Sequence, residues 1–183
     1  MTTQSNHSLP EAVLVAEAVK ENRKAQEELY HRYAPKMYAL CLRYSGGNTN
    51  DAQDFLQEGF IRAFQNLHSF RGEGSFEGWL KKLFVYNCLN QLRRKNRPAN
   101  VDVEEVVVAE KSLTGYDRIA MKDLMNIINS IPPGYRTVIN LYLVEGYSHK
   151  EIADMMGIKE STSKSQLARG KEFLQKKIDL HNK

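Results

Sequence analysis

The stretch SHKEIADMMGIKESTSKSQLARG, residues 148–170, has the pattern of a helix-turn-helix, in which two helices meet at a short turn. Ser148 and Glu151 have the spacing of a capping box, in which the hydroxyl accepts from a helical amide and the carboxylate reaches back to the serine N–H. Ala153 is small, as required where a second helix packs closely, and Gly157 suits a turn that needs a positive φ. Other helical corners share part of this pattern. The residues on the exposed side of the second helix therefore indicate whether the motif binds DNA.

The helix after the turn is predicted to expose a polar, cationic side. Its apolar residues share the other side: Leu167, Leu174 and Ile178. The polar side offers Lys164, Ser165, Ala168 and Lys171, with Arg169 at its flank. Because the major groove of DNA admits an α-helix whose side chains donate to base edges, this side predicts a DNA-reading helix.

The rest of the chain is predicted to be helical as well. Apolar residues recur at i, i+3 and i+4 through residues 10–97, and again from residue 124 to the motif. Residues 98–116 between them show no helical period and carry four acidic side chains. A short strand at 106–108 stays open, but a flexible linker is the favoured interpretation. The predicted fold is therefore all-α, with two small helical domains at residues 10–97 and 117–180.

The net charge of +4 is unevenly distributed along the 183 residues. Residues 1–97 contribute +4, the connector 98–116 contributes −3, and residues 117–183 contribute +3. No acidic residue occurs from Gly78 to Val101, where six Lys and Arg side chains fall. A solvated helix face accounts for many such runs, but the length of this one favours a polyanionic partner such as nucleic acid.

Aromatic residues around this basic run leave two interpretations open. Aromatic rings stack on unpaired bases while nearby cations hold the phosphates. Rings at helical spacing are also typical of the core of a small helical domain, which is the favoured interpretation for Trp79 and Phe84. For Phe70 and Arg71, in a glycine-rich loop, neither interpretation is preferred.

Several classes of protein are excluded by the motifs that the sequence lacks. The five His residues are scattered, and no HExxH, P-loop or GxSxG motif occurs, so neither an enzyme nor a bound cofactor or metal is expected. Cys41 and Cys88 have no CxxC spacing, which favours two half-buried free thiols in a reducing cytoplasm. No run of about 18 apolar residues and no signal-peptide pattern occurs, so a cytoplasmic protein is expected.

Two stretches resemble parts of one protein family. Residues 51–80, DAQDFLQEGFIRAFQNLHSFRGEGSFEGWL, resemble region 2 of the extracytoplasmic-function (ECF) sigma factors. Residues 131–174, IPPGYRTVINLYLVEGYSHKEIADMMGIKESTSKSQLARGKEFL, resemble their region 4. The wider resemblance covers residues 10–97 and 117–180, with no region-3 domain between them.

The resemblance implies a bacterial RNA polymerase sigma factor. Such a protein binds core RNA polymerase, directs it to specific promoters and helps open promoter DNA, while the polymerase does the catalysis. An anti-sigma factor is implied as a further partner.

The resemblance also assigns roles by position. The face that docks on the clamp helices of the largest polymerase subunit matches Asp51, Asp54, Gln57 and Glu58. The region 2 residues expected at the minus-ten element are Arg62 at its upstream edge, Phe70 and Arg71 in the loop that captures a flipped base, either Tyr86 or Asn87, and the basic pair Arg93 and Arg94. The helix that reads the minus-thirty-five element matches Lys164, Ser165, Ala168, Arg169 and Lys171. Ser163 replaces a usual apolar residue, which predicts looser docking of that helix.

A stand-alone helix-turn-helix regulator with a helical sensing domain is the alternative. It would bind DNA without polymerase, as a dimer on a palindrome. The acidic face at residues 51–58 argues against it, and an RNA-binding or scaffold protein leaves the capped helical corner unexplained. A gel shift with and without core polymerase separates the three.

Overall fold

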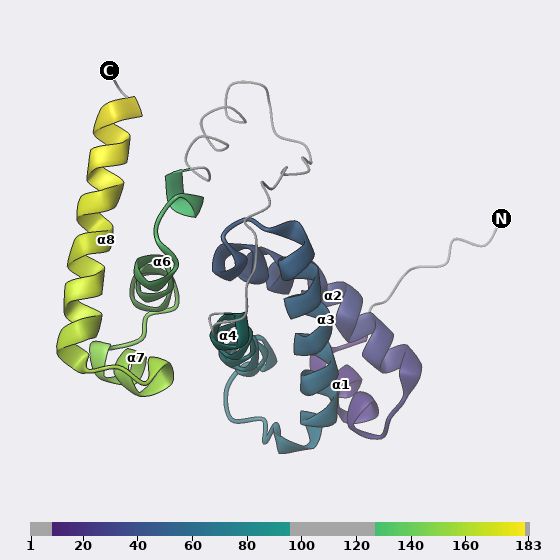
Figure 1. Ribbon diagram of the computed structural model, residues 1–183. Coiled ribbons are helices and arrows are strands. Elements are labelled where there is room, and N and C mark those ends of the chain that lie inside the picture. Colours follow the sequence, from purple (N-terminus) through teal and green to yellow (C-terminus); the bar gives the residue numbers. More distant parts are fainter. Residues whose placement is uncertain (1–8, 96–126, 182–183) are drawn as a thin grey trace.

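The structure, a computed structural model, describes residues 9–95 and 127–181. Every regular element in these two ranges is a helix, and they contain no strand (Figure 1). The predicted all-α fold is therefore confirmed, whereas the predicted linker at residues 98–116 lies outside the described residues. None of the described helices is long and apolar enough to cross a membrane.

The N-terminal bundle consists of four helices and one 3-10 turn. They are α1 (Glu11–Val19), α2 (Arg23–Ser45), α3 (Thr49–Gln65), η1 (Leu67–Ser69) and α4 (Phe76–Lys95). The Asn22 side chain caps the start of α2, and the Asn48 side chain caps the start of α3 by accepting from the Asp51 amide at 3.0 Å. Gly46 ends α2 in the left-handed conformation, with φ +72°. These local signals fix where the long helices turn.

The core of this bundle comes from the apolar positions of the helical pattern. Leu29, Met37, Phe55 and Phe84 are all fully buried. A Cβ on Gly59 of α3 would collide with the Phe84 ring of α4, so glycine sets how closely these two helices approach. The core interpretation of Phe84 is confirmed, and Trp79 is partly buried against the same core.

The two cysteines lie together inside this core. Cys41 and Cys88 are free thiols with no exposed surface, so the expectation of half-buried thiols is wrong. A hydrogen bond with Cys41, together with burial, raises the pKa of the Cys88 thiol well above its usual range. The thiols behave as small core residues.

The C-terminal helices are α6 (Pro133–Ile139), the π-helical turn η2 (Asn140–Val144), α7 (His149–Met156) and α8 (Glu160–His181). The predicted capping box is present, because the Glu151 amide donates to Ser148 Oγ at 3.3 Å and the Ser148 amide donates to the Glu151 carboxylate at 2.8 Å. Gly157 has the expected positive φ, +67°. The helix-turn-helix formed by α7 and α8 is thus as the sequence predicts.

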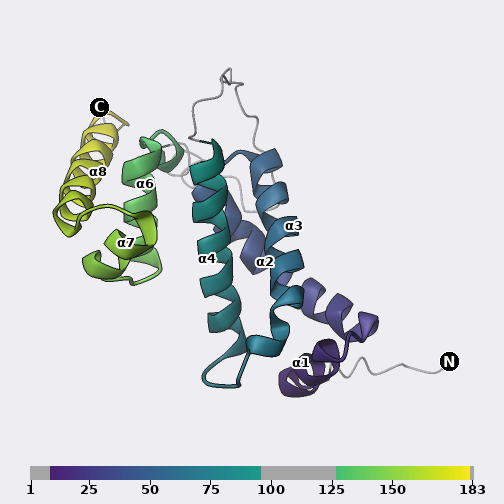
Figure 2. The same ribbon diagram turned by 60° about the horizontal axis from the view of Figure 1, so that its bottom comes forward.

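The C-terminal helices pack against the N-terminal bundle. Helix α4 lies between α3 on one side and α6 and α7 on the other (Figures 1 and 2). Arg136 of α6 is buried at this junction, where its guanidinium donates to the carbonyls of Asn129 at 2.8 Å and Ile131 at 3.1 Å. A Cβ on Gly46 would collide with that guanidinium, so the glycine that ends α2 also admits Arg136.

Candidate nucleic-acid and polymerase interfaces

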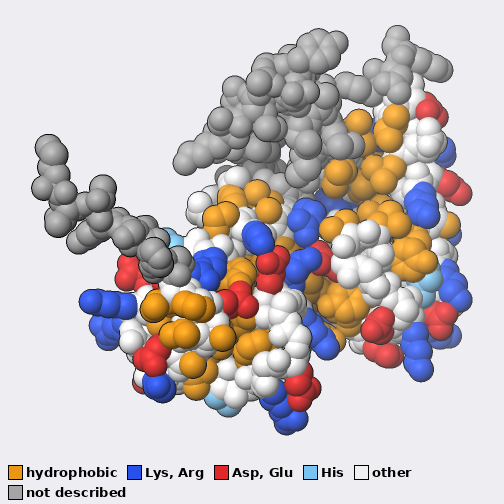
Figure 3. Space-filling view, turned by 180° about the vertical axis from the view of Figure 1, so that it is seen from behind, with side chains coloured by type: hydrophobic (Ala, Val, Ile, Leu, Met, Phe, Trp, Pro, Cys, Tyr) orange, Lys and Arg blue, Asp and Glu red, His pale blue; other side chains and the backbone are white. Residues whose placement is uncertain are grey.

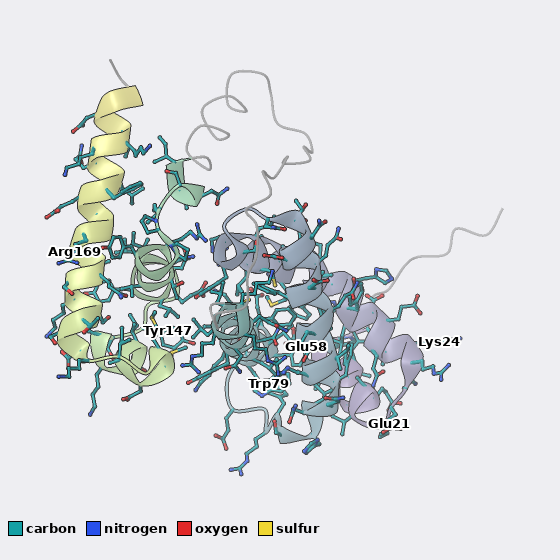
Figure 4. The ribbon with its side chains drawn as sticks, viewed as in Figure 1. Glu21, Lys24, Glu58, Trp79, Tyr147 and Arg169 are labelled. Atoms are coloured by element: carbon teal, nitrogen blue, oxygen red, sulfur yellow. The ribbon has the colours of Figure 1, made fainter. Side chains whose placement is uncertain are left out.

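Helix α8 presents one buried side and one open side. Ser163, Leu167 and Gly170 are buried, and Gly170 allows close approach because a Cβ there would lie 2.7 Å from Ile139 Cδ1. All five predicted DNA-reading residues are exposed: Lys164, Ser165, Ala168, Arg169 and Lys171. Arg169 lies on the outer helix, away from the N-terminal bundle (Figure 4). The open side of α8 is therefore free to enter a groove.

A polar contact holds the first turns of α8 against α7. Ser163 is fully buried, and its Oγ lies 2.9 Å from His149 Nδ1. The His149 ring stacks on Tyr142, with ring centres 4.4 Å apart. This hydrogen bond stands where the resemblance implied an apolar contact. The sequence did not predict this role of His149. The only signal for it is a serine, fourteen residues later, at a buried position of the next helix.

The predicted polymerase-docking residues lie along α3. Asp54 and Gln57 are exposed, whereas the other two are half-buried. Asp51 forms an ion pair with Lys95 of α4, and Glu58 forms one with Arg62 at 2.8 Å. Asp54 forms no ion pair within the described residues. The face thus offers a partner one unpaired carboxylate, with a second at Glu58 that Arg62 holds in place.

A hollow of about 340 Å³ opens between α3 and α4. Its walls are Arg62, Asn66, Ser69, Trp79, Leu83, Tyr86, Asn87 and Asn90. Tyr86 is 43% exposed, whereas Asn87 is 2% exposed and donates to the Phe55 carbonyl at 3.0 Å. Asn87 Oδ1 is buried, and no residue of the described ranges donates a hydrogen bond to it. The structure therefore turns Tyr86 outward and holds Asn87 against α3.

The loop before α4 divides between core and surface. Phe70 packs on Phe76 and Trp79, with ring centres 5.4 and 5.7 Å apart, so it belongs partly to the core. Arg71 is exposed at the start of the glycine-rich turn. Gly72 and Gly74 have positive φ and open space around them. Of the two predicted residues, Arg71 is the more accessible to a nucleic acid.

The basic end of α4 meets the C-terminal helices. Arg94 is exposed, and the Arg93 guanidinium donates to the Met155 carbonyl of α7. Lys81, in the acid-free run, forms an ion pair with Glu145 at 3.2 Å. No local pattern predicts these contacts, because the paired residues are 62 and 64 positions apart in the chain.

Comparisons with known proteins match both parts of the chain. The family model for Sigma-70 region 2 matches residues 29–98, and the model for Sigma-70, region 4 matches residues 121–174. The ECF RNA polymerase sigma-E factor of Escherichia coli K12 is 30% identical over 186 residues, covering 94% of this chain and 96% of that protein. The chain belongs to the ECF sigma factor family. The resemblance seen in the sequence is confirmed.

Other relatives agree. The ECF sigma factor SigW of Bacillus subtilis is 29% identical and covers 91% of this chain and 97% of its own. SigE of Mycolicibacterium smegmatis is 32% identical over 162 residues, and the match spans 62% of that longer relative.

Two solved structures share the fold. Sigma factor RpoE, crystallised with the anti-sigma factor NepR from Bartonella quintana, has a TM-score of 0.59 at 21% identity, covering 84% of this chain and 96% of its own. CnrH, in complex with the cytosolic domain of CnrY, has a TM-score of 0.52 at 22% identity, covering 93% and 97%. At these identities the likeness shows the fold alone.

Proposed function

We propose that this ECF sigma factor divides promoter recognition between its two helical parts. Members of the family direct core RNA polymerase to promoters and help initiate transcription, and they act by binding rather than by catalysis. The proposed domains are residues 10–97 for region 2 and 117–180 for region 4, joined by residues 98–116. Family membership favours this function over a stand-alone regulator.

The acidic face of α3 is proposed to dock on the polymerase. Charges at an interface steer association and fix the register of the partners more than they add affinity. Exposed Asp54 and the nearby Glu58 supply these charges, while Asp51 is tied to α4 by Lys95. Arg62, which pairs with Glu58 at 2.8 Å, lies where this face meets the hollow between α3 and α4.

Region 2 is proposed to hold the minus-ten element at the hollow between α3 and α4. The ring of Tyr86 is exposed for stacking, Arg62 lines the wall, and Arg71 lies on the neighbouring loop. Stacking of a base on an aromatic ring contributes about 1–3 kcal/mol, which offsets the cost of unstacking it from the duplex. Arg93 and Arg94 are proposed to contact phosphates at the end of α4.

Region 4 is proposed to read the minus-thirty-five element with α8. The observation that carries the proposal is the arrangement of exposed and buried residues on this helix. Five predicted residues share the open side of the helix, and the buried residues between them fix its orientation. A gel shift with promoter fragments tests it, because the complex should require both core polymerase and this chain. A specific shift by the chain alone would instead support a stand-alone regulator.

An anti-sigma factor is the proposed regulatory partner, and the cytoplasm is the proposed location. One structural neighbour, RpoE, was crystallised with the anti-sigma factor NepR, and the other, CnrH, is in complex with the cytosolic domain of CnrY. Copurification from the native host tests the first proposal. The chain should copurify with core polymerase or with an anti-sigma protein, but not with both at once. The location follows from the polymerase that the protein serves.

A further inference from the structure

A carboxylate from region 4 is buried against two cations of region 2. The Glu145 side chain follows η2 and is only 4% exposed. One of its oxygens lies 2.8 Å from Arg43 Nη2 of α2, and the other lies 3.2 Å from Lys81 Nζ of α4. Both carboxylate oxygens therefore have a cationic partner from the other part of the chain.

A second contact places a region 4 oxygen on another cation of α4. The Arg93 guanidinium donates to the Met155 carbonyl in the last turn of α7. The final carbonyls of a helix lack partners within the helix and carry partial negative charge. Asn140 adds a hydrogen bond across the same boundary, since its Nδ2 donates to the Arg43 carbonyl at 3.2 Å. In the view from behind, Lys and Arg side chains meet Asp and Glu side chains along this boundary (Figure 3).

The two α4 cations that pair with these oxygens lie in the part of the helix that has no acidic residue. Lys81 and Arg93 lie on α4 within residues 78–101, and Arg93 is one of the residues proposed to contact DNA. A phosphate group would offer the same chemistry, an anionic oxygen that accepts from Lys or Arg. Each cation keeps further N–H donors, so the two acceptors compete for position: a phosphate at the same place would meet the Glu145 carboxylate, which carries a like charge.

We infer that region 4 acts as an internal competitor of DNA, in which the Glu145 carboxylate and the Met155 carbonyl take the phosphate positions on the basic face of α4. This inference rests on the proposed function, because it needs α4 to bind DNA. Region 4 has to leave this face before region 2 engages single-stranded promoter DNA. We call the arrangement closed when region 4 lies on α4 and open when it has left. Because the two equilibria are linked, the factor by which closing weakens DNA binding equals the factor by which bound DNA favours opening.

Two substitutions break the contact from opposite sides and change the charge in opposite directions. Glu145→Gln removes a negative charge, and Arg43→Gln removes a positive charge that lies outside the proposed DNA-binding set. If region 4 competes with DNA, both variants expand the chain and both bind DNA more tightly. If charge alone matters, Glu145→Gln binds more tightly and Arg43→Gln binds more weakly.

Matched controls carry the same charge changes away from the boundary. Glu21→Gln alters an exposed carboxylate between α1 and α2, and Lys24→Gln alters an exposed amine at the start of α2, both on the side of the molecule away from the C-terminal helices (Figure 4). Circular dichroism checks that each variant is folded. If Arg43→Gln does not fold, Glu145→Gln is compared with Glu21→Gln alone.

The experiment measures the radius of gyration of the full chain by small-angle scattering and its affinity for a short fluorescein-labelled single-stranded DNA by anisotropy, at one fixed salt concentration. We expect both boundary variants to expand and to bind the DNA at least about fivefold more tightly, the lower end of coupling between linked sites. Each control should stay within about twofold of the wild type. Binding that does not tighten in expanded variants, or variants that do not expand, would overturn the competition. If no variant binds the DNA even when expanded, the assignment of α4 to DNA fails with it, whereas transcription by the wild-type chain with core polymerase still tests the sigma function.

Discussion

The contact between His149 and Ser163 is predicted to stabilise the docking of α8 on α7. His149→Phe keeps a ring that can stack on Tyr142 but removes the nitrogen that lies 2.9 Å from Ser163 Oγ. Because Ser163 is fully buried, water cannot replace the lost partner. A buried polar group left without a partner costs about 1–3 kcal/mol, so His149→Phe should lower the free energy of unfolding by that amount.

The double variant distinguishes this hydrogen bond from packing. Ser163→Ala together with His149→Phe removes both polar groups, and such paired replacement is close to neutral. We therefore expect the double variant to be more stable than His149→Phe alone, with a coupling energy of about 1–2 kcal/mol. Urea unfolding followed by circular dichroism gives the four free energies of this cycle. Additive effects of the two substitutions would refute the account of this contact.

Four further predictions follow from the site and the fold. Asp54→Arg with Glu58→Arg should weaken retention on core polymerase in a pull-down, since both changes reverse charge on the proposed docking face; wild-type retention would contradict the docking assignment. Arg169→Ala should cost about 1–3 kcal/mol at one promoter position, and Lys171→Ala should weaken binding evenly and lower the salt slope by about one; unchanged transcription from a promoter library by both variants would show that α8 does not enter the groove. Gly59→Ala should destabilise the chain by about 1–3 kcal/mol in urea unfolding, because its Cβ meets the Phe84 ring; a neutral result would show that α3 and α4 separate easily. Hydrogen bonds from the Ser148 backbone and hydroxyl hold the pKa of Glu151 below 4.5, its usual value, so the stabilisation by the capping box is present above 4.5 and is lost as the pH falls through the lowered pKa. Acid unfolding of Glu151→Gln, which has no carboxyl to titrate, should lack this loss, and identical acid profiles for the variant and the wild type would count against it.

The sequence predicts those parts of the fold that depend on local chemistry. The capping box at Ser148 and the turn at Gly157 are each determined by residues within a few positions of one another, and both are present. The helices follow from apolar periodicity, and the same periodicity separates the exposed side of α8 from its buried side. Local signals of this kind need no knowledge of the partner elements.

Contacts between distant segments lie outside the reach of such signals. Glu145 and Arg43 are 102 residues apart, and nothing near either residue marks the other as a partner. Tyr86 and Asn87 differ by about 100° around α4, so only the packing of α4 on α3 decides which one turns inward. Arg136 is buried on carbonyls rather than on a carboxylate, so charge patterning gave no indication of its position.

Transcription from a promoter library with purified core polymerase, in the presence and absence of this chain, tests the central claim most directly. The account predicts that a defined set of promoters is transcribed only when the chain and core polymerase are both present. It also predicts that the Asp54→Arg, Glu58→Arg double variant loses this activity while retaining its helical content. Promoter-specific binding by the chain alone, without any chain-dependent transcript, would contradict the assignment as a sigma factor.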